Sequence, residues 1–261
     1  MLRSPFLISL LFILILSCKE KTTIPVVQNS IQKEAKLYQE KAIKNLQNKE
    51  FNSGFYNLNK SKIIFESIKD SANIAYNLIQ MASIQQINGD YYGSKETLTE
   101  ALPYVKDDIN YRTAIANFFG IAHKELSIYD DAVFYYKQAI KNAKDTLAKQ
   151  APLNNIAVVY IQQNKNDQAI QILEAILENK IQSKLLPTSK ARIFDNLGFA
   201  YFKKGDLIKS LSLMNTGLEM RNQAVDLYGS IESNLHLAEY HSKTNTEKSV
   251  QHAEQAYKLS S

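Results

Sequence analysis

Glycine and proline are scarce in this sequence. Its 261 residues include only 8 Gly and 5 Pro, too few turn formers to separate the many short strands of a β-sandwich or a β-barrel. With 45% hydrophobic and 22% charged residues, the chain otherwise has the composition of an ordinary globular protein, which excludes extensive disorder. The scarcity of turn residues therefore predicts an all-α fold.

Cysteine occurs once, at Cys18, so no disulfide can form within the chain. Before it, Arg3 supplies a positive charge, and the stretch from Phe6 to Leu16 is apolar except for Ser9. A run of this length fits the core of a signal peptide and is too short for a comfortable membrane span. The first residues are therefore expected to be a targeting segment outside the fold.

The apolar run ends in Ile15-Leu16-Ser17-Cys18, which resembles the lipobox of bacterial lipoproteins. The resemblance implies cleavage before Cys18 and lipidation of Cys18, with an uncleaved signal anchor or a buried free thiol as the alternatives. Several acyl chains would hold the product on a membrane almost permanently. Lys19 stands where an Asp retains well-studied lipoproteins at the inner membrane, so the resemblance points to a lipid-anchored protein of the bacterial cell envelope, at the outer membrane. The leaflet that it faces stays open.

The residues after Cys18 are polar and lack helical periodicity up to Lys33, which indicates a flexible tether. The expected domains are a signal peptide at residues 1–17, the acylated Cys18 and tether at residues 18–33, and a repeat domain at residues 34–261.

Arginine is rare as well, although the formal net charge is +5. Arginine is the residue that reads bases and phosphates through paired hydrogen bonds, and the charges here are spread along the chain with acidic residues among them. Nucleic acid is therefore not expected as a partner. The four arginines are Arg3, Arg112, Arg192 and Arg221.

Catalytic and metal-binding motifs are missing too. The sequence contains no phosphate-binding Gly-rich loop, no zinc-protease helix, no nucleophile elbow and no Cys pair. Among the four histidines, His236 and His241 lie five residues apart, which puts them on different faces of a helix. We expect no enzymatic activity, no metal and no cofactor.

A repeated pattern is what the sequence does contain. In its clearest copy, Leu197-Gly198 and Tyr201 are followed by Gly205-Asp206-Leu207 and then by small residues around Met214. This copy resembles a tetratricopeptide repeat, a pair of helices joined by a tight turn. Each copy has one small residue that would open the packing face of its second helix, and these residues lie 37 to 41 positions apart. They are Gly54, Ser94, Ala132, Ala169, Ser210 and Ser249.

The resemblance implies an all-α, tetratricopeptide-type α-solenoid, a right-handed superhelix of about six helix-turn-helix repeats. The usual period is about 34 residues, so longer helices or loops are expected between repeats, as between Asn179 and Ser189. Small residues such as Gly120, Ala157 and Gly198 should mark the close helix crossings, and Tyr136 and Tyr201 should fill the gaps.

Short polar residues recur three positions before the crossing residues of four successive repeats. Asparagine is unfavourable inside helices, so its recurrence calls for a reason. In related repeats, asparagines near this register hold the backbone of an extended peptide through their amides, whereas the alternative is an inter-repeat brace. The four residues are Asn117, Asn154, Asp195 and Asn234, and Lys124, Gln162 and Lys203 would line the same groove.

The function expected from these features is a membrane-tethered scaffold or adaptor that binds a peptide or protein partner in its concave groove. The alternative is the ligand- or peptide-sensing part of a signal-transduction or transcriptional regulatory system. The last helix expected, Glu247 to Leu259, has no polar capping helix after it. Weak self-association through Tyr257 and Leu259 is therefore expected as a further property.

Overall fold

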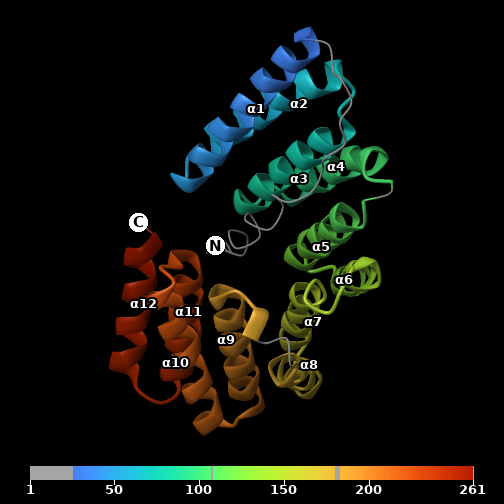
Figure 1. Ribbon diagram of the computed structural model, residues 1–261. Helices are drawn as coiled ribbons and strands as arrows, with labels where there is room; N and C mark the ends of the chain where they lie inside the picture. The colour runs from blue at the N-terminus through green and yellow to red at the C-terminus, as the bar shows by residue number, and fades with distance from the viewer. Residues whose placement is uncertain (1–25, 107, 180–182, 261) are drawn as a thin grey trace. The chain divides into compact units, whose positions relative to one another are not determined.

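The computed structural model describes residues 26–106, 108–179 and 183–260 (Figure 1). The expected signal peptide, Cys18 and the first part of the tether lie outside these ranges. Within them the chain forms α-helices joined by short connections and no strand, as the scarcity of glycine and proline predicted. The helices are α1 (Val26–Gln47), α2 (Phe51–Ser67), α3 (Ser71–Ile87), α4 (Tyr91–Ala101), α5 (Ile109–Glu125), α6 (Tyr129–Asn142), α7 (Gln150–Gln162), α8 (Asn166–Glu178), α9 (Pro187–Lys204), α10 (Leu207–Gln223), α11 (Leu227–Ser242) and α12 (Thr246–Ser260), with a 3-10 turn, η2 (Leu102–Tyr104), after α4.

The helices pair along the chain and divide into two compact units. The N-terminal unit contains the pairs α1/α2, α3/α4 and α5/α6, and the C-terminal unit contains α7/α8, α9/α10 and α11/α12. Within each unit every pair packs on the next one, and Figure 1 shows the two helices of a pair side by side. The predicted all-α, tetratricopeptide-type arrangement of six helix pairs is confirmed for the described residues.

The register of the second helices agrees with the sequence pattern. Each of the six small residues expected to open a packing face is the fourth residue of its helix, from Gly54 in α2 to Ser249 in α12. Ser94, Ala132, Ala169 and Ser210 are fully buried. Small side chains occur there because any larger one would push the paired helix away.

Two glycines mark close helix crossings, as predicted. A Cβ atom at Gly120 would lie 2.4 Å from the ring of Tyr136, which is fully buried. At Gly198 a Cβ atom would lie 2.8 Å from the backbone nitrogen of Met214 on α10. Tyr136 and Met214 therefore occupy the space that the absent side chains leave.

The turns within pairs depend on residues in the left-handed backbone region. Gly89 and Gly205 have φ values of +78° and +98° between the two helices of their pairs, a conformation that costs glycine nothing. The helices that follow are capped by Asp90 and Asp206, whose carboxylates accept hydrogen bonds from the backbone N–H groups of Gly93 and Lys209.

The first helix begins earlier than the sequence predicted. Helix α1 starts at Val26, inside the stretch that was expected to be a tether up to residue 33. Ile31 continues the spacing of the buried Ala35 and Ala42, and this spacing extends the apolar stripe of the helix toward its N-terminus. Helix α9 begins at Pro187, which takes the first helical position, where its missing N–H costs nothing.

Candidate functional site

The four polar residues predicted from the repeat register are all buried. The exposed fraction is 4% for Asn117 and Asn234 and 0% for Asn154 and Asp195. Asn154 Oδ1 on α7 accepts a hydrogen bond of 3.0 Å from Nδ2 of Asn196 on α9, and Asn154 Nδ2 has no partner among the described residues. These side chains lie between helices, which is the environment of an inter-repeat brace, and their role in partner binding stays a prediction.

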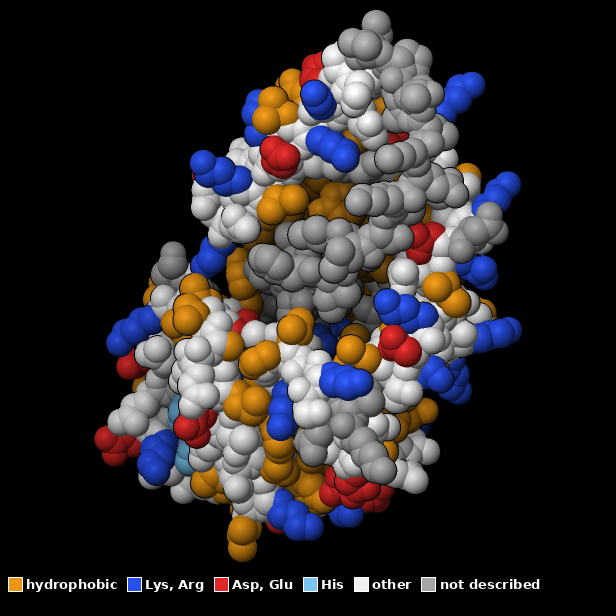
Figure 2. Space-filling view, in the orientation of Figure 1, with side chains coloured by type: hydrophobic (Ala, Val, Ile, Leu, Met, Phe, Trp, Pro, Cys, Tyr) orange, Lys and Arg blue, Asp and Glu red, His pale blue; other side chains and the backbone are white. Residues whose placement is uncertain are grey.

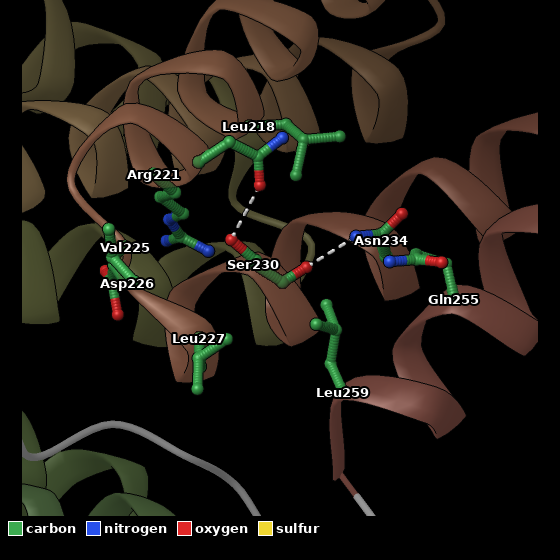
Figure 3. Close-up of a pocket in the computed structure, with 10 residues that line it drawn as sticks. Leu218, Arg221, Val225, Asp226, Leu227, Ser230, Asn234, Gln255 and Leu259 are labelled. Atoms are coloured by element: carbon green, nitrogen blue, oxygen red, sulfur yellow. Dashed lines mark hydrogen bonds between the residues drawn. The ribbon is translucent and has the colours of Figure 1, made fainter.

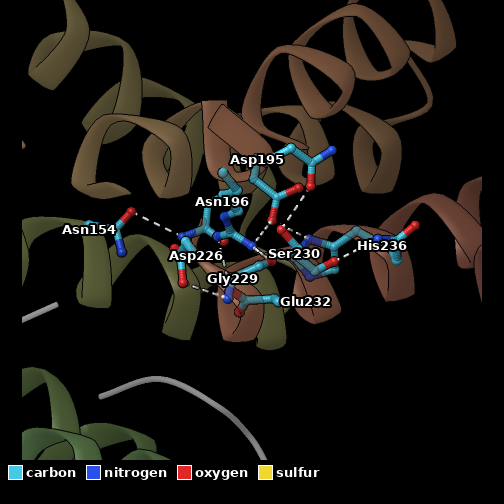
Figure 4. Close-up of polar contacts among 11 residues, drawn as sticks. Asn154, Asp195, Asn196, Asp226, Gly229, Ser230, Glu232 and His236 are labelled. Carbon is cyan, nitrogen blue, oxygen red and sulfur yellow. Dashed lines mark hydrogen bonds and ion pairs between the residues drawn. The ribbon is translucent and has the colours of Figure 1, made fainter. Parts of the chain in front are cut away.

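Asp195 is the centre of a charged cluster between α9, α10 and α11 (Figure 4). Its Oδ2 lies 3.5 Å from Nη1 of Arg221 on α10 and 3.0 Å from Nδ1 of His236 on α11. Arg221 is 1% exposed, and its Nη2 contacts Oε2 of Glu232 at 3.0 Å. Two carboxylates, a guanidinium and an imidazole thus connect three helices.

A glycine makes the cluster possible. A Cβ atom at Gly217 on α10 would lie 2.9 Å from the carbonyl oxygen of Ala191 and 2.9 Å from Cβ of Asp195. The absence of a side chain lets α10 approach α9 closely at this level. Arg221 follows Gly217 by one helical turn, on the same face, and is thereby placed beside Asp195.

The electrostatics of the cluster favour its ionised form. Burial would raise the pKa of Asp195, but the positive charges of His236 and Arg221 outweigh burial and hold that pKa below its ordinary value. For His236, burial would lower the pKa, but the charge and hydrogen bond of Asp195 together with Glu232 raise it above the ordinary value of 6.5. The ring of His236 also stacks on Phe199, with 4.0 Å between the ring centroids.

The raised pKa of His236 predicts a pH dependence of stability. A group whose pKa is higher in the folded protein stabilises the fold fully below its unfolded value of 6.5, and the contribution is lost as the pH rises through the folded value. We expect the free energy of unfolding, measured by urea denaturation, to fall as the pH rises above the ordinary His pKa of 6.5. His236→Gln should remove this part of the fall.

His241→Gln is the matched control for that measurement. Burial and the charge of Lys248 lower the pKa of His241, so its ionisation affects stability only below about pH 6.5. The control should keep the slope of the wild-type protein above that pH. A His236→Gln variant with the same slope would show that His236 does not carry the dependence.

The remaining predicted positions fall into two groups. Lys124 is 6% exposed and paired with Glu125, so it does not line an open groove. Gln162 and Lys203 are exposed, as the prediction required, and Lys203 Nζ lies 2.6 Å from Oε1 of Glu239 on the neighbouring α11. Both follow the crossing residue of their helix by five positions.

Asn234 on α11 is held from both sides. Its Nδ2 donates to the carbonyl oxygen of Ser230 at 2.8 Å, and its Oδ1 lies 2.8 Å from Nδ1 of His252 on α12. Tyr257, through which weak self-association was expected, is 74% exposed, and Leu259 is partly exposed. The self-association itself stays a prediction.

Sequence reasoning did not single out Arg221, Glu232 and His236 as site residues. The available signal was the rarity of arginine: in a chain that uses lysine for most positive charges, an arginine is the residue best suited to a buried ion pair. His123 is 5% exposed, and its Nδ1 lies 2.8 Å from the carbonyl oxygen of Phe119.

Comparison with known proteins agrees with this description. A model of the tetratricopeptide repeat matches residues 152–180, which cover most of α7 and α8. The chain has the fold of a tetratricopeptide-repeat protein. No curated protein sequence matches the chain.

In the part of the repeat domain that the structure describes, no helix is long and apolar enough to cross a membrane. In the same residues, no three His, Cys, Asp or Glu side chains are grouped to bind a metal.

Several solved structures share the fold at low sequence identity. The Rap conjugation gene regulator of plasmid pLS20, in complex with the Phr* peptide, is 13% identical with a TM-score of 0.69, over 94% of this chain and 79% of that one. Aspartyl phosphate phosphatase F from Bacillus subtilis is 15% identical with a TM-score of 0.69, over 90% and 72%. PilF from Pseudomonas aeruginosa is 16% identical with a TM-score of 0.56, over 88% and 93%.

Proposed function

We propose that this chain is a lipid-tethered, non-catalytic interaction protein whose repeat domain binds a peptide or protein partner in the bacterial cell envelope. The observation that carries the proposal is a recurring exposed row on first helices of the C-terminal unit. Gln162 on α7, Lys203 on α9 and Ser242 on α11 follow Ala157, Gly198 and Leu237 by five positions each, and all three are exposed. A row of exposed side chains on rigid, stacked helices offers regularly spaced contacts to an extended partner.

The row is polar, and Lys203 is its one charged member. Lys203 is paired with Glu239, and Figure 2 shows basic and acidic side chains interspersed on the visible face. Mixed charge favours a partner held by several modest contacts over a nucleic acid held by a basic patch.

Tethering rests on the sequence. The lipobox-like segment that ends at Cys18 would place the repeat domain on the outer membrane. A partner would then be captured at that surface.

A second candidate function is the peptide-sensing component of a signalling system. The observation in its favour is the high TM-score with the Rap regulator, which was solved with a peptide bound. The two functions differ in the consequence of binding: a scaffold holds its partner at the membrane, whereas a sensor reports the presence of a peptide.

Site-specific photo-crosslinking tests the proposal. We expect a photoreactive amino acid at position 162 or 203 to give an adduct in intact cells, because exposed side chains of the row would lie against the partner. The matched control is position 209, where Lys209 on α10 is also exposed but lies outside the row. The mass of the adduct distinguishes a peptide from a protein partner.

Attachment of the protein to the membrane is measured in the same cells. The adduct should sediment with membranes, and Cys18→Ala should release it or leave an unprocessed precursor, with loss of labelled fatty acid from the protein. Equal adduct at positions 203 and 209 would contradict the binding row, and an unlabelled wild-type protein would contradict the tether.

A further inference from the structure

A pocket of about 370 Å³ lies in the C-terminal unit where α10 ends, α11 begins and α12 ends (Figure 3). This volume is within the range of about 300–1,000 Å³ typical of sites for small ligands. The pocket is separate from the exposed row of Gln162, Lys203 and Ser242, since none of these residues lines it.

Aliphatic side chains from three helices form the walls of the pocket. Leu218 comes from α10, Leu227 from α11 and Leu259 from α12, and Figure 3 shows them around Ser230. Leu227 is 39% exposed. Three separate aliphatic surfaces around one hollow favour an apolar group as the occupant.

Carboxamides provide the polar part of the lining. Asn222 Oδ1 accepts a hydrogen bond of 3.1 Å from the hydroxyl of Ser230. The amide nitrogen of Asn222 takes no part in that bond. Gln255 on α12 is exposed at the opposite edge of the pocket. A carboxamide both donates and accepts hydrogen bonds, which suits the peptide groups on either side of an inserted side chain.

The two charged residues of the lining are already engaged. Asp226 caps α11, where its Oδ1 accepts a hydrogen bond of 3.0 Å from the backbone N–H of Gly229. Arg221 is 1% exposed and paired with Asp195 and Glu232. Both charged side chains therefore already have partners within the domain.

The rim of the pocket contains a strained residue. Val225 has φ +55°, in the left-handed region that a β-branched residue rarely adopts, and its side chain is 76% exposed. The other described residues that are not glycine and have positive φ are Lys49, Lys69, Ser127 and Asn164, none of them β-branched. Strain of this kind is concentrated at binding sites, and Val225 is one of the residues that line the pocket.

We propose that this pocket binds an uncharged aliphatic side chain of a peptide together with its flanking peptide groups. The inference deepens the proposed function, because it gives the repeat domain a docking point for the partner and names the residue type that enters it. The aliphatic group lies among Leu218, Leu227 and Leu259, and Asn222 and Gln255 hydrogen-bond the backbone beside it.

The test uses the full chain in a non-ionic detergent with N-acetyl-leucine methylamide as the probe. We expect concentration-dependent shifts of the methyl NMR signals of Val225, Leu227 and Leu259. The corresponding aspartate and lysine methylamides should bind at least about tenfold more weakly, because neither can bury an uncharged aliphatic group. No shift with the leucine probe, or equal shifts with all three probes, would overturn the proposal.

Leu227→Trp has a closely matched control in Leu207→Trp. Each leucine is the first residue of its helix after a capping aspartate, and the exposed fractions are 39% and 38%. We expect the indole of Leu227→Trp to fill the pocket and to weaken binding of the leucine probe at least about tenfold. Leu207→Trp should bind the probe with the affinity of the wild-type protein. Leu227→Trp with unchanged binding would contradict the proposal.

Leu259→Asn decides the question if Leu227→Trp fails to fold. Leu259 lies in the last turn of α12 and is partly buried, so a polar substitution there keeps the rest of the domain intact but removes one apolar wall. Binding by this variant equal to wild type would overturn the proposal. The adduct at position 203 is measured separately in each variant, so that failure of the pocket is distinguished from failure of the exposed row.

Discussion

Arg221→Met is expected to destabilise the C-terminal unit by about 3–5 kcal/mol, the usual cost of removing one partner from a buried ion pair. Arg221 is 1% exposed and Asp195 is 0% exposed, so water cannot replace the lost guanidinium. Methionine keeps much of the apolar contact of the arginine stem. The loss would therefore come from the uncompensated carboxylates of Asp195 and Glu232.

Urea denaturation measures this loss, and hydrogen exchange of the α9, α10 and α11 amides places it in the chain. Arg112→Met is the control, because Arg112 is exposed on α5 and surface substitutions usually change stability by no more than about 0.5 kcal/mol. Adding Asp195→Asn to Arg221→Met should restore part of the stability, since one buried charge disappears. If Arg221→Met and Arg112→Met unfold alike, the cluster does not hold the helices together.

Gly198→Leu should destabilise the same unit by about 3 kcal/mol, at the upper end of the usual cost of overpacking. A Cβ atom at position 198 would meet the backbone nitrogen of Met214 at 2.8 Å and the carbonyl oxygen of Ser210 at 2.9 Å. These are backbone atoms of α10, so the new side chain can be accommodated only if α9 and α10 move apart. That movement would also separate Asp195 from Arg221.

The control for this prediction is Ala253→Leu, at an exposed position of α12. It adds a similar volume to a helix without entering a crossing, and its effect should stay within about 0.5 kcal/mol. Thermal unfolding followed by circular dichroism compares the two variants. A melting temperature of Gly198→Leu equal to that of Ala253→Leu would mean that the crossing has been placed wrongly.

The helix pairs could be predicted because their signals are local. Small residues recur every 37 to 41 positions, and a close crossing needs one at each repeat whatever lies elsewhere in the chain. The beginning of α1 was harder to predict, because Ile31 is the only apolar residue between Val27 and Ala35. One residue does not establish a helical period before the packing partner is known.

The contacts of the candidate sites could not be predicted from local sequence patterns. The register located Asn154, Asp195 and Asn234, but not their partners, since Asn196 and His236 come from helices about 40 residues away in the sequence. The pocket has no sequence signal of its own. Leu218, Leu227 and Leu259 each look like an ordinary residue on an amphipathic helix, and only the packing of three helices brings them together.

The polar contacts between pairs also fix the order of the repeats. Arrays of identical repeats can be shortened, extended or permuted, because all their interfaces are alike. Here α7 meets α9 through an amide pair, Asn154 and Asn196, whereas α9 meets α11 through Asp195 and His236. Exchanging two pairs would place a carboxylate opposite an amide and leave a histidine without its acid. In the C-terminal unit, the polar contact between α7 and α9 therefore differs from that between α9 and α11, and this difference limits how insertion or duplication of a helix pair can enlarge the unit.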